Sequence, residues 1–180
     1  MTSIALLRGI NVSGRKIIKM TDLINIFEKL KFKNIKSYIQ SGNIIFDHEQ
    51  NETSFHTKEI EYKIQESLGI HVNVIIRTME ELENIINHNP FLPEKNIETN
   101  KLHVTLLNTV PNPTMVKELL IKTEDNERYQ IIGREIFIYC PNGYGRSKLT
   151  NTVFEKKLGV IATTRNWNTT IKLLEMAKGK

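Results

Sequence analysis

The sequence predicts an α+β fold of duplicated ferredoxin-like split βαβ units, which means two antiparallel sheets with helices. Two observations predict it. Short apolar runs typical of strands alternate with segments of helical periodicity, and the order strand, helix, strand, strand, helix, strand occurs twice. A segment with two prolines separates the two occurrences, so we expect a first half at residues 1–88, a linker at 89–100 and a second half at 101–180.

Local signals define the elements of the first half. Thr21 is expected to cap the first helix, and residues 41–43 (Ser-Gly-Asn) to form the hairpin turn, since Gly and Asn tolerate positive φ. Gly69 ends the second helix, and Thr78 with Glu81 forms a capping box for the third. Strands are expected at residues 4–7, 35–40, 44–46 and 72–77, and helices at 20–30, 54–68 and 78–87.

The second half repeats the order of elements without repeating the residues. The equivalent residues of the two halves are not a constant distance apart in the sequence: Leu106 follows Leu6 by more residues than Gly133 follows Gly42. Only the order of elements is therefore duplicated. Strands are expected at residues 102–107, 129–132, 136–139 and 160–162, and helices at 114–122, 148–158 and 169–177.

Composition argues against several classes of protein. No apolar run is long enough to span a bilayer, and no basic segment precedes the first apolar stretch, so we expect a cytoplasmic protein with no membrane partner. Cys140 is the single cysteine, and it ends a strand beside a proline, where a small buried side chain is usual. The histidines lack ligand spacing, which argues against a zinc module. We expect no cofactor.

Positive charge is concentrated at the two ends of the chain. Residues 1–36 hold eight Lys and Arg against two acidic residues, and residues 134–180 hold nine against three, whereas residues 37–90 hold three against nine. The formal net charge is +5. This asymmetry favours anionic partners through long-range attraction, and a solvated basic surface is the alternative.

Two motifs resemble known cofactor sites only superficially. The loop at residues 9–16 has the glycine spacing of a phosphate loop, but Arg15 stands at the lysine position and Lys16 at that of the Mg²⁺-binding hydroxyl. A weaker interpretation remains, in which this basic loop holds an oxyanion without Mg²⁺. Tyr144 and Lys148 have the spacing of a dehydrogenase pair, but a glycine lies between them and no G-x-G-x-x-G motif follows any strand.

Two expected helix N-termini carry cations where acidic residues are usual. Arg146 and Lys148 flank the helix expected at 148–158, and Arg165 precedes the last helix. A cation there costs roughly 0.3–1 kcal/mol unless an anion docks on the free N–H groups. The segment at residues 142–148 is therefore the best candidate for binding. The alternative is that these basic side chains point into water.

Trp167, the only tryptophan, lies among side-chain donors at residues 163–170. An indole beside an arginine can stack on a base or an aromatic ring. A single tryptophan is also a common core residue. Both interpretations remain open.

Four segments together resemble the bacterial domain-of-unknown-function family sixteen ninety-seven. The resemblance spans nearly the whole chain and is carried, in order, by residues 5–12, 38–43, 142–149 and 163–169. It implies an α+β arrangement of two ferredoxin-like halves and no particular activity. Two residues depart from the family pattern: Ser13 stands where glycine is expected, and Cys140 where an aliphatic residue is usual.

We therefore expect a binder of an anionic ligand, either a nucleotide-like small molecule or nucleic acid. Two alternatives remain: an enzyme acting on a phosphorylated or carboxylated substrate, with Tyr144 or Lys148 transferring a proton and Arg146 anchoring the anion, and a protein-interaction module. The sequence does not fix whether the motifs form one site or two, or the oligomeric state. The residues expected to hold the ligand are Arg8, Asn11, Tyr144, Arg146, Lys148, Arg165 and Trp167.

Overall fold

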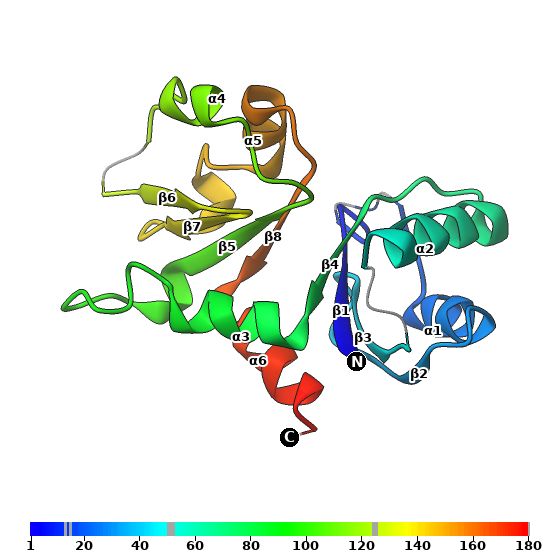
Figure 1. Cartoon of the computed structure of the whole chain (residues 1–180). Helices are drawn as coiled ribbons and strands as arrows, with labels where there is room; N and C mark the ends of the chain where they lie inside the picture. The colour runs from blue at the N-terminus through cyan, green and yellow to red at the C-terminus, as the bar shows by residue number, and fades with distance from the viewer. Residues whose placement is uncertain (13, 15, 50–52, 124–125, 180) are drawn as a thin grey trace. The chain divides into compact units, whose positions relative to one another are not determined.

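The structure is a computed structural model that describes the chain except for residues 13, 15, 50–52, 124–125 and 180 (Figure 1). It contains two compact units. Unit 1 comprises Met1–Glu83 and Leu173–Lys180, and unit 2 comprises Asn84–Lys172. The boundaries fall inside two helices, α3 (Met79–Asn87) and α6 (Trp167–Ala177), each of which begins in one unit and ends in the other. The division into a first half at residues 1–88, a linker at 89–100 and a second half at 101–180 stays a prediction.

Unit 1 holds, besides the start of α3, the elements β1 (Thr2–Leu7), α1 (Met20–Lys29), β2 (Lys33–Ser37), β3 (Asn43–Asp47), α2 (Thr53–Leu68) and β4 (Val74–Thr78). The strands form an antiparallel sheet in the order β2-β3-β1-β4. β1 and β2 therefore run parallel on either side of β3, and β3 and β4 run parallel on either side of β1. This is the arrangement of two interleaved split βαβ units.

The core of unit 1 lies between its sheet and the two helices α1 and α2, which stand on one side of the sheet (Figure 1). Ala5 and Leu7 of β1 face this core, since alternate residues of a strand share a face. Three phenylalanines meet there, with ring centroids 4.6–5.6 Å apart, and they are Phe27, Phe32 and Phe46. Their burial fixes the position of α1 over the sheet.

Unit 2 repeats this order with β5 (Leu102–Leu107), α4 (Pro113–Lys117), β6 (Arg128–Ile132), β7 (Glu135–Tyr139), α5 (Asn151–Leu158) and β8 (Ala162–Asn166), followed by α6. Its antiparallel sheet has the equivalent order β6-β7-β5-β8. Leu107, Ile138, Phe154 and Leu158 are among the residues that form the core against α4 and α5. The predicted fold class, an α+β protein with two antiparallel sheets of duplicated order, is confirmed.

The duplication extends to single positions in the sheets. Ile4 of β1 pairs with Arg77 of β4, and Val104 of β5 pairs with Arg165 of β8. Both arginines are buried, and each donates from Nη1 to the carbonyl of the preceding residue, at 3.0 Å and 2.9 Å. Each sheet therefore has a buried arginine at the equivalent position of its edge strand, β4 or β8, although arginine is rarely buried.

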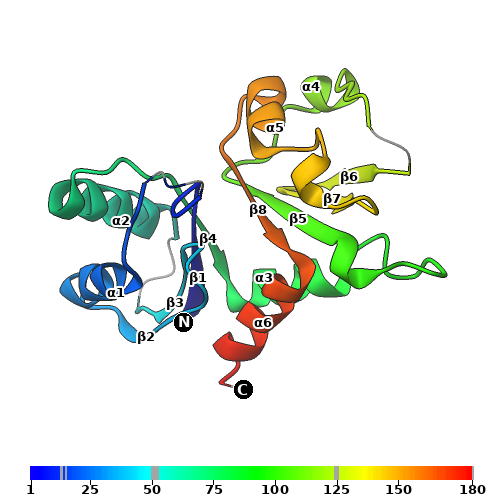
Figure 2. The same ribbon diagram turned by 180° about the vertical axis from the view of Figure 1, so that it is seen from behind.

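Several element boundaries differ from the sequence predictions. α1 is preceded by Lys19, which makes no side-chain cap, so Thr21 is not the N-cap but lies inside the helix. α4 ends at Lys117 rather than at residue 122. The last strand runs from Ala162 to Asn166 rather than over residues 160–162, because the β-branched residues before Arg165 pair with β5, and α6 follows it directly at Trp167 (Figure 2). The capping box is confirmed: Thr78 and Glu81 exchange backbone-to-side-chain hydrogen bonds of 2.9 Å and 3.1 Å.

Candidate functional site

Two of the predicted binding residues, Arg8 and Asn11, lie in unit 1 just after β1. Arg8 is half-buried, and its backbone N–H donates to the carbonyl of Asn73. The Asn11 side chain donates to the carbonyls of Ile18 and Gln40 and accepts from the Ile18 N–H, all at 2.8–2.9 Å. These bonds join the loop after β1 to the turn before β3, which favours a loop-closing role for Asn11 over ligand contact.

Three more predicted residues lie on a single turn of unit 2, between β7 and α5. Tyr144–Arg146 form a 3₁₀ turn, and Arg146 and Lys148 are exposed. The helix expected to begin at residue 148 begins at Asn151 instead, and the Thr150 side chain caps it by accepting from Val153 N–H at 3.4 Å. The two cations therefore precede a capped helix, and the prediction that they stand at its uncompensated N-terminus is wrong.

The ring of Tyr144 holds this turn in place. It is stacked on the His103 ring, with centroids 4.7 Å apart and an interplanar angle of 21°. The Tyr144 hydroxyl donates to Thr164 Oγ1 at 3.0 Å, and that hydroxyl donates to Asn151 Oδ1 at 2.6 Å. Burial lowers the pKa of His103, more than its backbone hydrogen bond raises it, so the imidazole in this stack is neutral at physiological pH.

The last two predicted residues, Arg165 and Trp167, are buried in unit 2. Arg165 Nη1 donates to Thr163 Oγ1 at 2.8 Å and to the Thr164 carbonyl. Burial lowers the pKa of Arg165 to about 10, which still leaves it charged at neutral pH. Trp167 is 1% exposed, so its indole lacks an open face for stacking. Both positions favour structural roles.

The predicted residues thus fall into two groups, one in each unit, and only the turn in unit 2 brings exposed cations together. Ser13 and Arg15 of the first loop lie outside the described residues. Cys140 is buried, and desolvation is the main reason that its pKa rises to about 11. A thiol with that pKa is protonated at neutral pH, which agrees with the expected structural role of Cys140.

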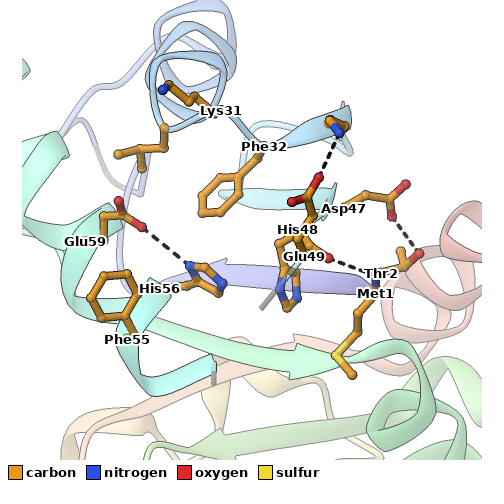
Figure 3. A pocket seen from close by; sticks show the side chains of 12 residues that line it. Met1, Thr2, Lys31, Phe32, Asp47, His48, Glu49, Phe55, His56 and Glu59 are labelled. Carbon is orange, nitrogen blue, oxygen red and sulfur yellow. Dashed lines mark hydrogen bonds and ion pairs between the residues drawn. The ribbon is translucent and has the colours of Figure 1, made fainter. Parts of the chain in front are cut away.

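A cavity of about 660 Å³ in unit 1 is lined by residues that the sequence analysis did not select (Figure 3). We call it the His56 pocket. It lies among the first residues of β1, the junction of α1 and β2, the end of β3 and the first turns of α2. The rings that line it are those of Phe32, His48, Phe55 and His56.

His56 lies at the centre of these rings. Its centroid is 5.1 Å from that of Phe32, 4.6 Å from that of His48 and 5.8 Å from that of Phe55, in edge-to-face arrangements. The residue is 5% exposed, and its Nδ1 lies 3.5 Å from Glu59 Oε2. His56 Nε2 is buried and has no hydrogen-bond partner among the residues that the structure describes.

Two of the acidic side chains that line the pocket are already bound. Asp47 accepts hydrogen bonds of 2.7 Å from Thr2 Oγ1 and Asn34 Nδ2. Burial raises the pKa of Asp47, but these two hydrogen bonds together with the positive N-terminus and His48 outweigh that effect and bring its pKa below the ordinary value. Glu49 is exposed and forms an ion pair of 3.0 Å with Lys33.

The lowered pKa of Asp47 predicts a pH dependence of stability. Its ionised form is favoured by folding, so its contribution is fully present above the ordinary aspartate pKa of about 3.9 and is lost as the pH falls through the lower folded-state value. The cost of Asp47→Asn is therefore expected to be larger at pH 6 than at pH 3, as measured by urea unfolding of both chains. An equal cost at the two pH values contradicts this assignment.

The pocket was missed because its histidines come together only in the tertiary structure. His48 follows β3 and His56 lies in the first turns of α2, and two histidines eight residues apart in the sequence form no ligand motif. Among residues outside the masked positions, no group of three or more His, Cys, Asp and Glu side chains is placed to hold a metal ion.

The fold and the pocket together define a duplicated α+β protein with a cavity of ligand size in its first unit. The chain belongs to the family described as protein of unknown function (DUF1697), whose model matches residues 1–137. It is also similar to the solved structure of a conserved bacterial protein from Streptococcus pneumoniae, with a TM-score of 0.71, 20% sequence identity and coverage of 98% of each chain. At that identity the likeness shows the fold alone.

No curated protein matches the chain. In the described part of the chain, none of the helices combines the length and apolar character needed to cross a membrane.

Proposed function

We propose that this protein is a cytoplasmic binder of an anionic, phosphate-bearing ligand, either a nucleotide-like molecule or nucleic acid, and that the turn at residues 144–148 is its contact surface. The observation that carries the proposal is a fixed turn with exposed cations. The Tyr144 ring and hydroxyl anchor the turn from inside, while Arg146 and Lys148 are exposed on it. Cations on an ordered turn lose less conformational freedom on binding than cations on a free loop.

Charge supports the same choice of ligand. The segment at residues 134–180 holds nine Lys and Arg against three acidic residues. No ion pair or side-chain hydrogen bond joins Arg146 to another described residue. A guanidinium in that situation is suited to bidentate contact with phosphate oxygens. Arg8, in unit 1, stays a predicted contact of the same ligand class.

Binding is favoured over catalysis at this turn. The enzyme alternative gives Tyr144 or Lys148 the role of proton donor or acceptor. The Tyr144 hydroxyl donates to Thr164 Oγ1, which in turn donates to Asn151, so its proton is committed to an internal chain of hydrogen bonds. This arrangement supports a positioning role for Tyr144.

The proposal predicts that Arg146→Glu weakens binding of a fluorescein-labelled single-stranded RNA by roughly tenfold, because one phosphate contact is replaced by repulsion. Fluorescence anisotropy at several salt concentrations measures this loss. The slope of log K against log salt is expected to become shallower by about one unit. Lys95→Glu, at an exposed lysine of the same unit, is the control with the same change in charge.

Equal losses for Arg146→Glu and Lys95→Glu contradict a specific contact at the turn. A second titration with a fluorescent ATP analogue distinguishes the two ligand sources. Binding of the nucleotide with little salt dependence indicates a small-molecule ligand, whereas a steep salt dependence for RNA alone indicates nucleic acid.

A further inference from the structure

β6 is an edge strand of the sheet in unit 2, and β2 has the equivalent edge position in unit 1 (Figure 1). The register of β2 with β3 is broken between Lys33 and Lys36, both of which are exposed, and Asn34 between them has a φ of 51°. Bulges and exposed lysines keep an edge strand from pairing with another chain. β6 has neither device, because its register with β7 is unbroken over Arg128–Ile132, all of which the structure describes, and this strand contains no lysine.

Two residues of β6 direct unpaired backbone groups away from the sheet. A two-residue turn joins β6 to β7, and in such a hairpin the flanking pair, here Ile132 and Glu135, exchanges both backbone hydrogen bonds. Bonded pairs alternate along the ladder, so the N–H and C=O groups of Tyr129 and Ile131 point away from β7. None of these groups bonds to another residue in the described part of the chain. An edge of this kind is a template for one more strand.

An exposed leucine lies close to this edge. Leu120 is 82% exposed, more than any other large apolar side chain among the residues that the structure describes. Both of its sequence neighbours pack in the core to which Tyr129 and Ile131 belong. The Tyr129 hydroxyl also donates to the carbonyl of Leu119 at 3.4 Å. Leu120 is therefore held beside β6 on the helix side of the sheet, where a strand added to the edge covers apolar surface.

The residue pattern of β6 fits a second copy of the same strand. In an antiparallel pair centred on Gln130, Tyr129 of each copy lies opposite Ile131 of the other, so their free N–H and C=O groups bond reciprocally. The Tyr129 and Ile131 side chains of both copies then lie on the helix side of the joined sheet, next to Leu120. A surface that complements itself in this way is what a two-fold dimer requires.

The charges of β6 permit this pairing. Arg128 lies opposite Ile132 of the other copy, so no two cations face each other. The Arg128 guanidinium donates to both carboxylate oxygens of Glu94, at 2.8 Å and 3.0 Å, which compensates its charge within one chain. Gln130, which faces itself across the two-fold axis, is uncharged. The edge therefore has no uncompensated charge that selects an acidic or a basic peptide over a second β6.

We propose that β6 pairs with β6 of a second copy of this chain, which joins the unit 2 sheets of the two copies into one antiparallel sheet and shields Leu120 from water. The contact is small, because β6 has five residues and standard interfaces have roughly 20–30 residues a side. Monomer and dimer are therefore expected to exchange. The interface shares no residue with the turn at residues 144–148 and does not rest on the proposed function.

Sedimentation equilibrium of the full chain tests the pairing. The average mass is expected to rise with protein concentration from that of one chain toward twice that value, with a Kd below about 1 mM. Gln130→Lys, which sets two cations side by side on the two-fold axis, is expected to weaken the dimer by roughly tenfold, and Gln130→Glu to do the same with two anions. An equimolar mixture of the two variants is expected to associate again, because opposite charges then face each other. Gln65→Lys is the control with the same change in charge, since Gln65 is exposed on α2.

Amide hydrogen exchange identifies the surface used. The Tyr129 and Ile131 amides are expected to exchange more slowly as the protein concentration rises, and Leu120→Ser, at an exposed side chain, is expected to weaken the dimer. The proposal is overturned if the unchanged chain stays monomeric at about 1 mM or if the two amides exchange at the same rate at every concentration. It is also overturned if Gln65→Lys weakens association as much as Gln130→Lys, or if the mixture associates no better than either variant alone.

Discussion

Gly42→Ala is expected to lower the free energy of unfolding by about 2–5 kcal/mol, because two separate costs add at this position. The residue has a φ of 73°, a conformation that an L-residue with a Cβ adopts only with strain. A Cβ built there also lies 2.7 Å from Leu7 Cβ and 2.8 Å from Ile10 Cδ1, two fully buried side chains. Neither neighbour is free to move out of the core.

Gly9→Ala separates these two costs. Gly9 has a similar φ of 66°, but a Cβ there meets nothing within 4 Å. Only the backbone strain applies, so the expected loss is roughly 1–2 kcal/mol. Urea unfolding followed by circular dichroism measures both variants. Equal losses contradict the close packing of the turn against β1.

The sequence predicted the turn at Gly42 but not the contact of this turn with β1. The Ser-Gly-Asn turn was predicted from hairpin chemistry, and β3 does begin at Asn43. The carbonyl of Gly42 also accepts from Leu7 N–H at 2.8 Å, and the Asn43 side chain donates to Tyr38 O and Ser41 Oγ. The Asn43 hydrogen bonds stay within the hairpin, whereas the bond from Leu7 depends on β1, which local turn rules do not include.

The fold class was predictable because it depends on patterns that repeat. The order of elements occurs twice, and the apolar run of β1, like the largely apolar β5, is typical of a buried strand. Helix boundaries were less predictable. The start of α5 was placed three residues early, because a 3₁₀ turn at Tyr144–Arg146 and a Thr150 cap replace the first turn of the expected helix.

The candidate sites were predictable only where the chemistry is local. The exposed cations of the turn at residues 144–148 follow from their sequence. The His56 pocket does not, because an unsatisfied nitrogen arises from what surrounds it, here Phe32 and Glu59. The burial of Arg165 was also not predicted from the sequence. Arginine is rarely buried, and the pattern of residue types around Arg165 gives no reason to expect a buried side chain.

Arg165→Ala is expected to lower the free energy of unfolding by about 3 kcal/mol or more, because it removes a large buried side chain and its charge-assisted hydrogen bonds. Thr163 Oγ1, which accepts from the guanidinium, loses that donor in the variant. Arg146→Ala is the control, because that side chain is exposed, and its expected effect is within about 0.5 kcal/mol. Urea unfolding measures both variants.

The duplicated arginine explains why this substitution tests a role in folding rather than in binding. Arg77 occupies the equivalent register position in unit 1 and makes the same hydrogen bond to the carbonyl before it. The loops and turns around the two arginines differ in sequence, so a requirement shared by both sheets points to the sheet itself. Arg77→Ala is therefore expected to cost about as much as Arg165→Ala, roughly 3 kcal/mol. If Arg165→Ala instead leaves stability unchanged and abolishes RNA binding, Arg165 is a ligand contact, and the exposed turn is only part of the site.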